Sequence, residues 1–505
     1  MPDMPEERPV VAVAGATGFV GKSLLQALQT KYRVVGLTRS PTRAANKDES
    51  GVEWRHCDLF SIAQVESALR DVDYAIYLVH SMLPNARLQQ ASFLDLDVLL
   101  ADNFARAAET NGVKQILYLG GIRPEGKKLS RHLRSRLETE AVLSARSVPT
   151  TALRAGLIVG PGGSSMRMMV NLVRRLPVMI LPSWTASKSA PIGIEDVVRA
   201  ILRCIGNPDT YNQHFDLGGP EAMSYRDMMQ RTAEVLGVRR PMLNTPFFSP
   251  RLSTVWVATC ATTPRALVGP LVESLEHSML PKPNWLNSWL LETDPRTFED
   301  ALRNSVRPDR RPVANPRSKL VKRDTKYIRK AATVRSVQRL PLPEGTGAAW
   351  ATDEYIRWLP RFLWPLLNVV VEGSLVEFRV ARTVLLQLRY RRDLSGRDRQ
   401  FLEITGGVLA KIGDSHQGRL EFREVNGGRA LFAAIHDFQP RLPWYLYNAT
   451  QALVHLFIMK AFGYHLARVG GPGSTKPLLP RSVSVSPPAP EAMPRRERAR
   501  RALEL

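Results

Sequence analysis

The 505-residue sequence is poor in cysteine. Its three cysteines, Cys57, Cys204 and Cys260, are too few and too scattered for a disulfide framework or a zinc site. The histidines likewise show no metal-ligand spacing, so we assign no metal. This shortage excludes a small disulfide-stabilised secreted domain and favours a reducing, cytoplasmic setting.

Long hydrophobic runs are also missing. The segment Met1–Pro9 is acidic and contains proline, so we expect no secretory signal there. The most apolar stretch, Trp444–Leu466, contains polar residues that are costly in a bilayer core, among them Lys460 and His465. We interpret it as an amphipathic helix of a globular domain, with peripheral contact to the inner face of the membrane as the alternative.

Acidic residues are scarce relative to basic ones, with 47 against 70 and a formal net charge of +23. The excess is uneven, because Arg303–Arg339 holds 13 Lys and Arg and only two acids. We interpret residues 303–332 as a solvated basic linker and the Pro- and Arg-rich residues 470–505 as a disordered tail. No nucleic-acid-binding module is recognisable, so no specific nucleic-acid partner is expected.

Before the basic stretch, apolar runs alternate with helical patterns. We expect buried strands at Val10–Ala14, Arg33–Thr38, Tyr74–Val79 and Gln115–Leu119, and helices at Lys22–Gln29, Ile62–Arg70, Phe93–Asn111 and His132–Ala145. Such alternation is typical of a doubly wound parallel sheet with helices on both faces. The sequence therefore predicts an α/β first domain at residues 1–302.

After the basic stretch the pattern becomes that of antiparallel strands. Ser374–Val380 and Thr383–Tyr390 alternate in strand fashion, and Leu420–Val425 and Leu431–Phe438 flank a strong hairpin turn at Asn426–Gly428. One long helix over Trp444–Leu466 follows. We expect an α+β second domain at residues 333–469.

A glycine-rich turn joins the first strand to the first helix. Gly15, Gly18 and Gly21 have the G-x-x-G-x-x-G spacing that lets backbone approach a pyrophosphate at a helix N-terminus. The site predicted around this turn comprises Gly15, Thr17, Gly18, Phe19, Val20 and Gly21. The pattern in this context predicts a dinucleotide cofactor.

Residues at the ends of the following strands complete the predicted site. Arg39, followed by Ser40, stands where an acidic residue accepts the ribose hydroxyls of NAD, and its guanidinium suits the 2′-phosphate of NADP. Asp58 and Leu59 are expected beside the adenine, and Val79 and His80 in the cofactor cleft. NADP is therefore the expected cofactor, with NAD as the alternative, and a surface role for Arg39 stays open.

Several motifs resemble a known family. They are Gly-Ala-Thr-Gly-Phe-Val-Gly at 15–21, Tyr-Leu-Val-His-Ser-Met at 77–82, Leu-Tyr-Leu-Gly-Gly-Ile at 117–122 and Leu-Arg-Ala-Gly-Leu-Ile-Val-Gly at 153–160. The first 300 or so residues resemble the atypical short-chain dehydrogenase/reductases of the NmrA-like, NAD(P)-binding group. The resemblance implies a Rossmann-type domain with a small substrate lobe, followed by a helix-grip-like domain of unknown function.

The resemblance also implies a catalytic pattern from which this sequence departs. The family places Tyr-x-x-x-Lys on one helix and Ser at a strand end, whereas this chain has His132 and Arg136 on the helix and Gly120-Gly121 at the strand end. Two hypotheses follow. Either His132, with an ordinary pKa near ~6.5, donates a proton and Arg136 holds the nicotinamide ribose, or the site binds NADP(H) without catalysis as a sensor.

The substrate side of the first domain is rich in methionine and tryptophan. Residues 161–182 and 247–302 carry apolar side chains that would suit a small apolar molecule such as a carbonyl or quinone acceptor, although core packing explains them equally. The helix-grip-like domain could in the same way enclose a hydrophobic ligand.

Overall fold

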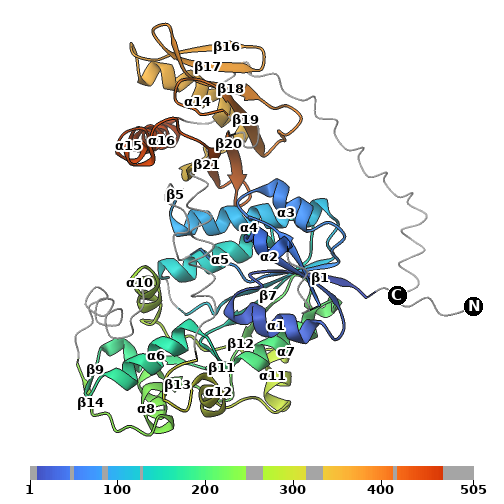
Figure 1. Ribbon diagram of the computed structural model, residues 1–505, viewed down its shortest axis with the longest axis vertical. Helices are drawn as coiled ribbons and strands as arrows, with labels where there is room; N and C mark the ends of the chain where they lie inside the picture. The colour runs from blue at the N-terminus through green and yellow to red at the C-terminus, as the bar shows by residue number, and fades with distance from the viewer. Residues whose placement is uncertain are drawn as a thin grey trace, which may run out of the picture.

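The computed structural model describes residues 8–45, 51–81, 89–125, 129–245, 265–313, 334–412 and 418–469 (Figure 1). The predicted tail at 470–505 and most of the predicted linker lie outside these residues. So do Trp256 and Cys260 of the predicted substrate side.

The first domain is built on a seven-stranded parallel sheet, which confirms the predicted fold class. The strand order is β12-β7-β6-β4-β1-β2-β3. The strands are β1 (Val10–Ala14), β2 (Arg33–Thr38), β3 (Val52–His56), β4 (Tyr74–Tyr77), β6 (Gln115–Gly121), β7 (Thr150–Ala155) and β12 (His214–Leu217). The strand order reverses between β1 and β4, which is where sheets of this type bind their ligands.

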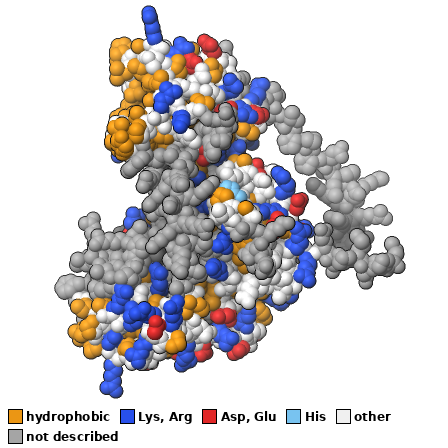
Figure 2. Space-filling view, in the orientation of Figure 1, with side chains coloured by type: hydrophobic (Ala, Val, Ile, Leu, Met, Phe, Trp, Pro, Cys, Tyr) orange, Lys and Arg blue, Asp and Glu red, His pale blue; other side chains and the backbone are white. Residues whose placement is uncertain are grey.

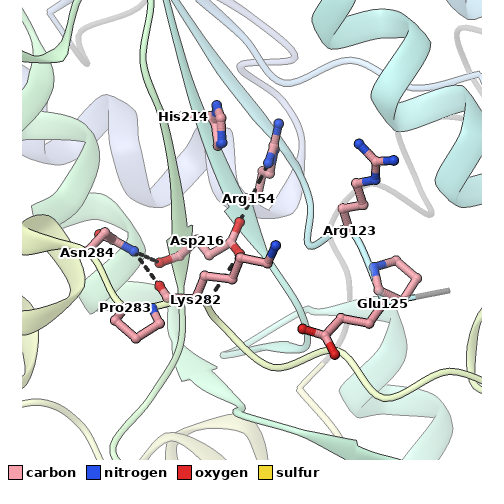
Figure 3. Close-up of a pocket in the computed structure, with 9 residues that line it drawn as sticks. Arg123, Glu125, Arg154, His214, Asp216, Lys282, Pro283 and Asn284 are labelled. Carbon is pink, nitrogen blue, oxygen red and sulfur yellow. Dashed lines mark hydrogen bonds and ion pairs between the residues drawn. The ribbon is translucent and has the colours of Figure 1, made fainter.

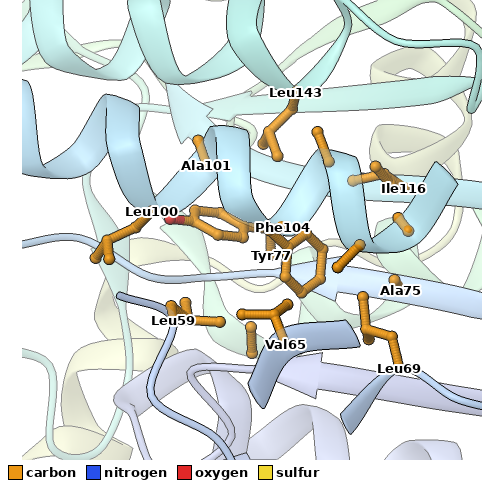
Figure 4. Packing of buried hydrophobic residues seen from close by; sticks show 14 of the residues in the cluster. Leu59, Val65, Leu69, Ala75, Tyr77, Leu100, Ala101, Phe104, Ile116 and Leu143 are labelled. Atoms are coloured by element: carbon orange, nitrogen blue, oxygen red, sulfur yellow. The ribbon is translucent and has the colours of Figure 1, made fainter. Parts of the chain in front are cut away.

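Helices cover both faces of this sheet, because successive strand residues point to opposite sides. One face packs against α1 (Phe19–Leu28), α7 (Ile194–Cys204) and α11 (Trp285–Glu292). The other packs against α3 (Ile62–Ala68), α4 (Phe93–Thr110) and α5 (Arg131–Leu143). On this second face Tyr77, Phe104 and Tyr118 form an aromatic cluster, with the ring centroids of Tyr77 and Phe104 5.1 Å apart (Figure 4).

A lobe follows the carboxyl ends of β7 and β12. Its elements are β8 (Ile158–Val159), α6 (Ser164–Arg175), β9 (Met179–Leu181), η1 (Ser183–Ala186), β10 (Lys188–Ser189), β11 (Ile192–Gly193), β13 (Met223–Ser224), α8 (Tyr225–Val235), β14 (Met242–Asn244), α10 (Arg265–Ser274) and α12 (Phe298–Ser305). The short helix η2 (Pro208–Thr210) lies instead at the opposite edge of the sheet, where Thr151 Oγ1 donates a 2.7 Å hydrogen bond to the Thr210 carbonyl oxygen. Met166, Met169, Met179 and Trp184 are all buried in one cluster with α8 and α12. These side chains of the predicted apolar pocket therefore pack as the core of the lobe.

The second domain is an antiparallel sheet with helices on one face, as the sequence predicts. Its strands are β16 (Asn368–Glu372), β17 (Leu375–Val380), β18 (Thr383–Tyr390), β19 (Arg399–Gly406), β20 (Arg419–Val425), β21 (Ala430–Phe438) and β15 (Val334–Pro341), in that spatial order. Asn426 and Gly427 turn the β20–β21 hairpin with φ of +55° and +66°. Val425 pairs with Ala430, so residues 426–429 form a four-residue loop, in which Gly428 also has a positive φ of +83°.

The helices of the second domain differ from the sequence prediction. The predicted single helix is broken at Thr450, whose φ and ψ of −128° and −85° separate α15 (Trp444–Ala449) from α16 (Gln451–Arg468). An unpredicted helix, α14 (Ala348–Phe362), packs beside α16. Tyr355 of α14 lies 5.1 Å from Phe462 and 5.4 Å from Phe422 between ring centroids, so aromatic side chains fill the interior where a hydrophobic ligand was expected.

The two domains share a core. The side chains of Val337, Phe432 and Ala434 from β15 and β21 belong to the same buried cluster as α3 and α4 of the first domain. The neighbouring residues Leu431 and Ala433 point the other way, into the core of the second domain. Strand β21 is therefore buried on both faces, and the second domain lies against α3 and α4 (Figure 1).

Both ends of the basic stretch Arg303–Arg339 belong to folded elements, α12 and β15. Arg303 lies within α12, and the chain continues in a turn closed by a hydrogen bond from the Val313 amide to the Ser305 carbonyl oxygen. At the other end Arg335 and Arg339 belong to β15. Both make ion pairs with carboxylates of the first domain, so these two arginines hold the second domain against the first.

Candidate functional site

The glycine-rich turn forms a tight cradle at the carboxyl end of β1. Gly15 has a φ of +89°, and a Cβ there would lie 3.1 Å from the backbone of Leu78. A Cβ on Gly21 would lie 2.4 Å from the Gly15 carbonyl oxygen. The Gly18 amide donates a 2.8 Å hydrogen bond to that same oxygen and caps α1. Only glycine fits at Gly15 and Gly21, which leaves the first N–H groups of α1 open to an anion such as a pyrophosphate.

The other residues predicted in this turn lie around the cradle. Thr17, Phe19 and Val20 are half-buried, and Val20 packs against the core beneath α1. The Phe19 ring is close to the lobe, because a Cβ at Gly160 would lie 3.1 Å from its Cζ. The turn thus faces the segment after β8.

The end of β2 carries a cation beside the cradle. Arg39 is half-buried and makes no hydrogen bond or ion pair with another residue in the described part of the chain. The Ser40 amide donates a 3.2 Å hydrogen bond to Thr38 Oγ1, and Ser40 Oγ lies 2.9 Å from Thr42 Oγ1. These bonds fix the turn after β2 and leave the Arg39 guanidinium available to a ligand.

At the end of β3, Asp58 has partners from both domains. Its Oδ1 accepts a 3.2 Å hydrogen bond from the Phe60 amide, and its Oδ2 forms an ion pair with Arg335 of β15. Burial raises the pKa of Asp58, but Arg335 and then Arg39 outweigh it, so this pKa lies below its ordinary value. Leu59 is buried, and its carbonyl oxygen accepts a 2.9 Å hydrogen bond from Asn103 Nδ2. Asp58 is therefore a carboxylate paired with Arg335, with the positive charge of Arg39 near enough to lower its pKa further.

The segment after β4 is fixed by a buried carboxylate. Asp97 of α4 is 1% exposed, and its Oδ1 accepts a 2.7 Å hydrogen bond from the Ser81 amide. Val79 packs against the core, and His80 is half-buried beside it. Because Leu78 touches Gly15, this segment borders the glycine cradle.

The same carboxylate holds Arg136. Arg136 Nη2 lies 2.6 Å from Asp97 Oδ2, and Ser135 Oγ donates a 2.6 Å hydrogen bond to the same oxygen. Arg136 is 7% exposed, and its Nε has no hydrogen-bond partner among the described residues. The guanidinium is therefore positioned by α4 and keeps one donor for a ligand hydroxyl.

His132 differs from what the sequence suggested. Burial, and then the neighbouring charge of Arg136, lower its pKa to about 3. Its Nδ1 lies 3.4 Å from Ser274 Oγ, which in turn lies 2.8 Å from Ser130 Oγ at the N-cap of α5. The ordinary pKa assumed for His132 was wrong, since the imidazole is neutral at pH 7 and holds no extra proton to donate.

The strand end that lacks the family serine has two unlike glycines. A Cβ at Gly120 would lie 2.7 Å from the Tyr118 ring, whereas a Cβ at Gly121 would meet nothing closer than Leu133 at 3.6 Å. The backbone would therefore accept a side chain at Gly121, and the site lacks a hydroxyl there by sequence and not because of crowding.

A polar pocket of about 600 Å³ opens beside the edge strand β12 (Figure 3). It is lined by Arg123, Pro124, Glu125, Arg154, His214, Asp216, Lys282, Pro283 and Asn284. Arg154 is paired with Glu140 at 2.6 Å, and the Lys282 amide donates a 3.1 Å hydrogen bond to Asp216 Oδ2. Sequence reasoning missed this pocket, because its residues come from four segments that are far apart in the chain.

Metal and membrane features are absent from the described residues. No group of three or more His, Cys, Asp or Glu side chains there could hold a metal ion. Among the helices of the described ranges, none has the length and apolarity needed to cross a bilayer.

Comparison with known proteins agrees with the geometry of the first domain. Residues 11–218 match the model of the NAD dependent epimerase/dehydratase family. The auxiliary protein GraX of Staphylococcus aureus is 29% identical over 177 residues, which are 32% of this chain and 57% of that protein. The ceramide reductase of Caulobacter vibrioides is 25% identical over 243 residues, which are 48% of this chain and 75% of that protein.

Two solved structures resemble the chain over the same region. One is the NADPH-dependent quinone oxidoreductase of Escherichia coli, with 20% identity, a TM-score of 0.46 and coverage of 58% of this chain and 98% of that one. The other is the triphenylmethane reductase of Citrobacter sp. complexed with NADP(H), with 18% identity, a TM-score of 0.47 and coverage of 59% and 100%.

Proposed function

We propose that the protein is an NADP(H)-dependent oxidoreductase acting on an apolar carbonyl or quinone acceptor, a proposal supported by the match of residues 11–218 to the model of the NAD dependent epimerase/dehydratase family. The observation that carries the proposal is the glycine cradle at Gly15 and Gly21 with the available guanidinium of Arg39 beside it. When bound, NADPH supplies a hydride from its nicotinamide ring.

Different residues of the chain would bind different parts of the cofactor. The α1 amides receive the pyrophosphate, and Arg39 receives the 2′-phosphate, for which its planar fork of donors is suited. Arg136 has a buried unpartnered Nε, which suits a ribose hydroxyl near the carboxyl end of β6. Asp97 is a positioning residue, because it fixes both Arg136 and the segment after β4.

The absence of a proton-donating side chain limits which electron acceptors the site can reduce. With glycine at position 121 and a neutral His132, no side chain of the family's pattern is ready to protonate a developing alkoxide. A quinone suits this site best, because its reduced oxygen is far less basic than an alkoxide. The quinone gains a hydride and one proton from water, and hydroquinone and NADP⁺ are the products. The ceramide reductase among the relatives, named for a lipid substrate, supports an apolar acceptor.

The test is NADPH consumption by the purified full chain with a panel of short-chain quinones and aldehydes. We expect turnover with quinones and none with Gly21→Val, whose side chain collides with the Gly15 carbonyl oxygen. Gly396→Val is the matched control, because a Cβ there meets nothing within 4 Å. Equal turnover of wild type and Gly21→Val would overturn the proposal.

A second candidate is a protein that binds NADP(H) as a sensor without catalysis. The engagement of Arg136 by Asp97 and the neutral state of His132 favour it, since neither group is poised for proton transfer. Saturable binding of NADPH without consumption of any acceptor in the panel would support the sensor. Turnover that is lost in His132→Ala would exclude it.

A further inference from the structure

We propose that the second domain completes the cofactor site at its adenosine end, with Arg335 as a residue that determines the preference for NADP(H). This inference rests on the proposed function. In a sheet of this strand order the adenosine half of a dinucleotide extends from the glycine turn toward the carboxyl ends of β2 and β3. Arg39 and Asp58 mark those two ends.

Arg335 reaches this place from the other domain. Its guanidinium forms an ion pair with Asp58, and its Cζ lies 4.8 Å from the centroid of the Phe60 ring. The centroid of the Phe60 ring lies 4.5 Å from that of His436 in the second domain, with the two ring planes tilted by 46°. Arg335 is therefore held over the turn after β3 by contacts from both sides.

The same strand of the second domain also holds the connection that follows β4. The two-residue strand β5 (Gln89–Gln90) pairs in parallel with β15, with Gln89 opposite Arg335. Gln338 Nε2 donates a 2.9 Å hydrogen bond to the Gln90 carbonyl oxygen. Strand β15 thus contacts chain segments that follow both β3 and β4, which flank the adenosine end.

The charges of the arginines near Asp58 explain why this end of the site would prefer NADP(H) to NAD(H). Arg335 pairs with Asp58, and the charges of Arg335 and Arg39 both lower the pKa of this carboxylate, so two positive charges lie near one negative charge. A 2′-phosphate adds two negative charges, which an additional arginine compensates, whereas the 2′-hydroxyl of NAD gains little from it. Arg335 carries five N–H donors, so its ion pair with Asp58 leaves donors for a phosphate oxygen.

The test compares two arginines of the same strand. NADPH and NADH are titrated by protein fluorescence into the full chain and into Arg335→Ala and Arg339→Ala. Arg339 also joins the domains, through Asp95 at 2.7 Å and Glu138, but its ion pairs do not include Asp58. We expect Arg335→Ala to weaken NADPH binding about tenfold or more and NADH binding by less than about twofold, and Arg339→Ala to change neither.

The outcomes separate this inference from the proposed function. Failure of the wild-type chain to bind NADPH would refute the proposed function itself. Wild-type binding with unchanged affinity in Arg335→Ala, or equal weakening in Arg339→Ala, would overturn only the role of Arg335. Recovery of affinity in Arg335→Ala/Asp58→Asn would also overturn it, because Arg335 would then act only by neutralising Asp58.

A separate observation concerns the surface of the second domain. Apolar side chains are exposed at the end of α14 and just after it, and along α15 and α16: Phe362, Trp364, Leu366, Tyr445, Leu446, Leu453, Val454, Phe457 and Tyr464. We call these residues the aromatic face. It is continuous, because the rings of Phe362 and Phe457 lie 5.9 Å apart, and Figure 2 shows hydrophobic side chains gathered over this end of the molecule.

The α15–α16 part of the aromatic face carries basic charge, whereas on α14 Glu354 is paired with His465 of α16 at 2.8 Å. From residue 438 to residue 468 the chain has no Asp or Glu and carries Arg441, Lys460 and Arg468. Trp364 is 79% exposed, and tryptophan and tyrosine are the residues that favour the water–lipid boundary. From this complementarity we infer that the aromatic face docks on a bilayer surface containing anionic lipids, without spanning it.

Vesicle flotation tests this second inference. We expect the full chain to float with vesicles of phosphatidylglycerol and phosphatidylcholine, and less with phosphatidylcholine alone. Phe457→Glu should abolish flotation, whereas Leu243→Glu should not, because Leu243 is equally exposed, at 59%, but lies in the lobe of the first domain. Absence of flotation, or a wild-type dimer that Phe457→Glu converts to a monomer, would overturn the inference.

Discussion

Arg423 of β20 is the most informative residue of the boundary between the domains. It is 1% exposed, and its guanidinium contacts Glu421 of its own strand and Asp102 and Asn103 of α4. Replacement by alanine would remove one positive charge from between two buried carboxylates. We therefore expect Arg423→Ala to destabilise the second domain and its docking together.

The expected magnitude follows from what remains after the substitution. Asp102 keeps Arg106 at 2.7 Å, whereas Glu421, which is fully buried, keeps His436 at 3.6 Å, Arg419 at 3.7 Å and Arg399 at 3.9 Å. Breaking a buried ion pair on one side costs about 3–5 kcal/mol, and the surviving partners place this case near the lower end. A loss of about 3 kcal/mol corresponds to roughly a hundredfold change in the folding equilibrium.

The assay is urea denaturation followed by tryptophan fluorescence, since both domains contain tryptophan. Arg391→Ala is the control, because Arg391 also pairs with two carboxylates, Asp393 and Glu403, but is 34% exposed. The control should lose less than about 1 kcal/mol. A loss in Arg423→Ala no larger than in the control would refute the reasoning, as would destabilisation of the second domain alone with the first domain unchanged.

Three further predictions concern single groups. Gly121→Ser should have the melting temperature of the wild type, whereas Gly120→Ser should have a lower one, because its Cβ would collide with the Tyr118 ring. Thermal denaturation of the two variants checks this prediction, and equal melting temperatures would contradict it. Burial lowers the pKa of His455 from 6.5 to about 4, so the unfolded chain binds the proton first and stability falls as pH drops through this range. His455→Gln should flatten that slope in urea titrations, and an unchanged slope would refute the assignment. Burial raises the pKa of Asp398, but its ion pairs with arginines of the first domain outweigh this and lower it from 3.8 to about 2. The contribution of ionised Asp398 to the free energy of unfolding is therefore complete above pH 3.8 and is lost as the pH falls toward 2. Asp398→Asn should remove this part of the dependence of stability on pH.

The parts of the fold that the sequence predicted are those with local signals. The strands β1 and β2, the glycine turn and the Asn426–Gly427 hairpin each depend on neighbours in the chain. The break at Thr450 and the helix α14 have no such local signature. The apolar residues of α16 are distributed around all sides of the helix. The periodicity of apolar residues alone therefore could not locate the break.

The docking of the domains depends on contacts between distant segments. Arg335 lies 277 residues from Asp58, and Arg339 lies 244 residues from Asp95. Arginines with no acidic residue near them in the sequence suggest a solvent-exposed segment. The carboxylates that pair with Arg335 and Arg339 lie far upstream and so do not show in the local sequence. The same reason explains why Arg335 was missed as a neighbour of the candidate site.

Part of the candidate site could be inferred from local sequence. The spacing located a turn in which only glycine fits at Gly15 and Gly21, and the binding of a cofactor by this turn and Arg39 stays a prediction. The neutral state of His132 could not be inferred, because its pKa depends on burial and on Arg136. The partner of Arg136, Asp97, lies 39 residues earlier on another helix.

Calorimetric titration of the purified full chain with NADPH and with NADH tests the central claim most directly. The geometry of the glycine cradle and of Arg39 predicts saturable binding of NADPH that is tighter than binding of NADH. Absence of binding for both nucleotides, or equal affinity for the two, would contradict the claim.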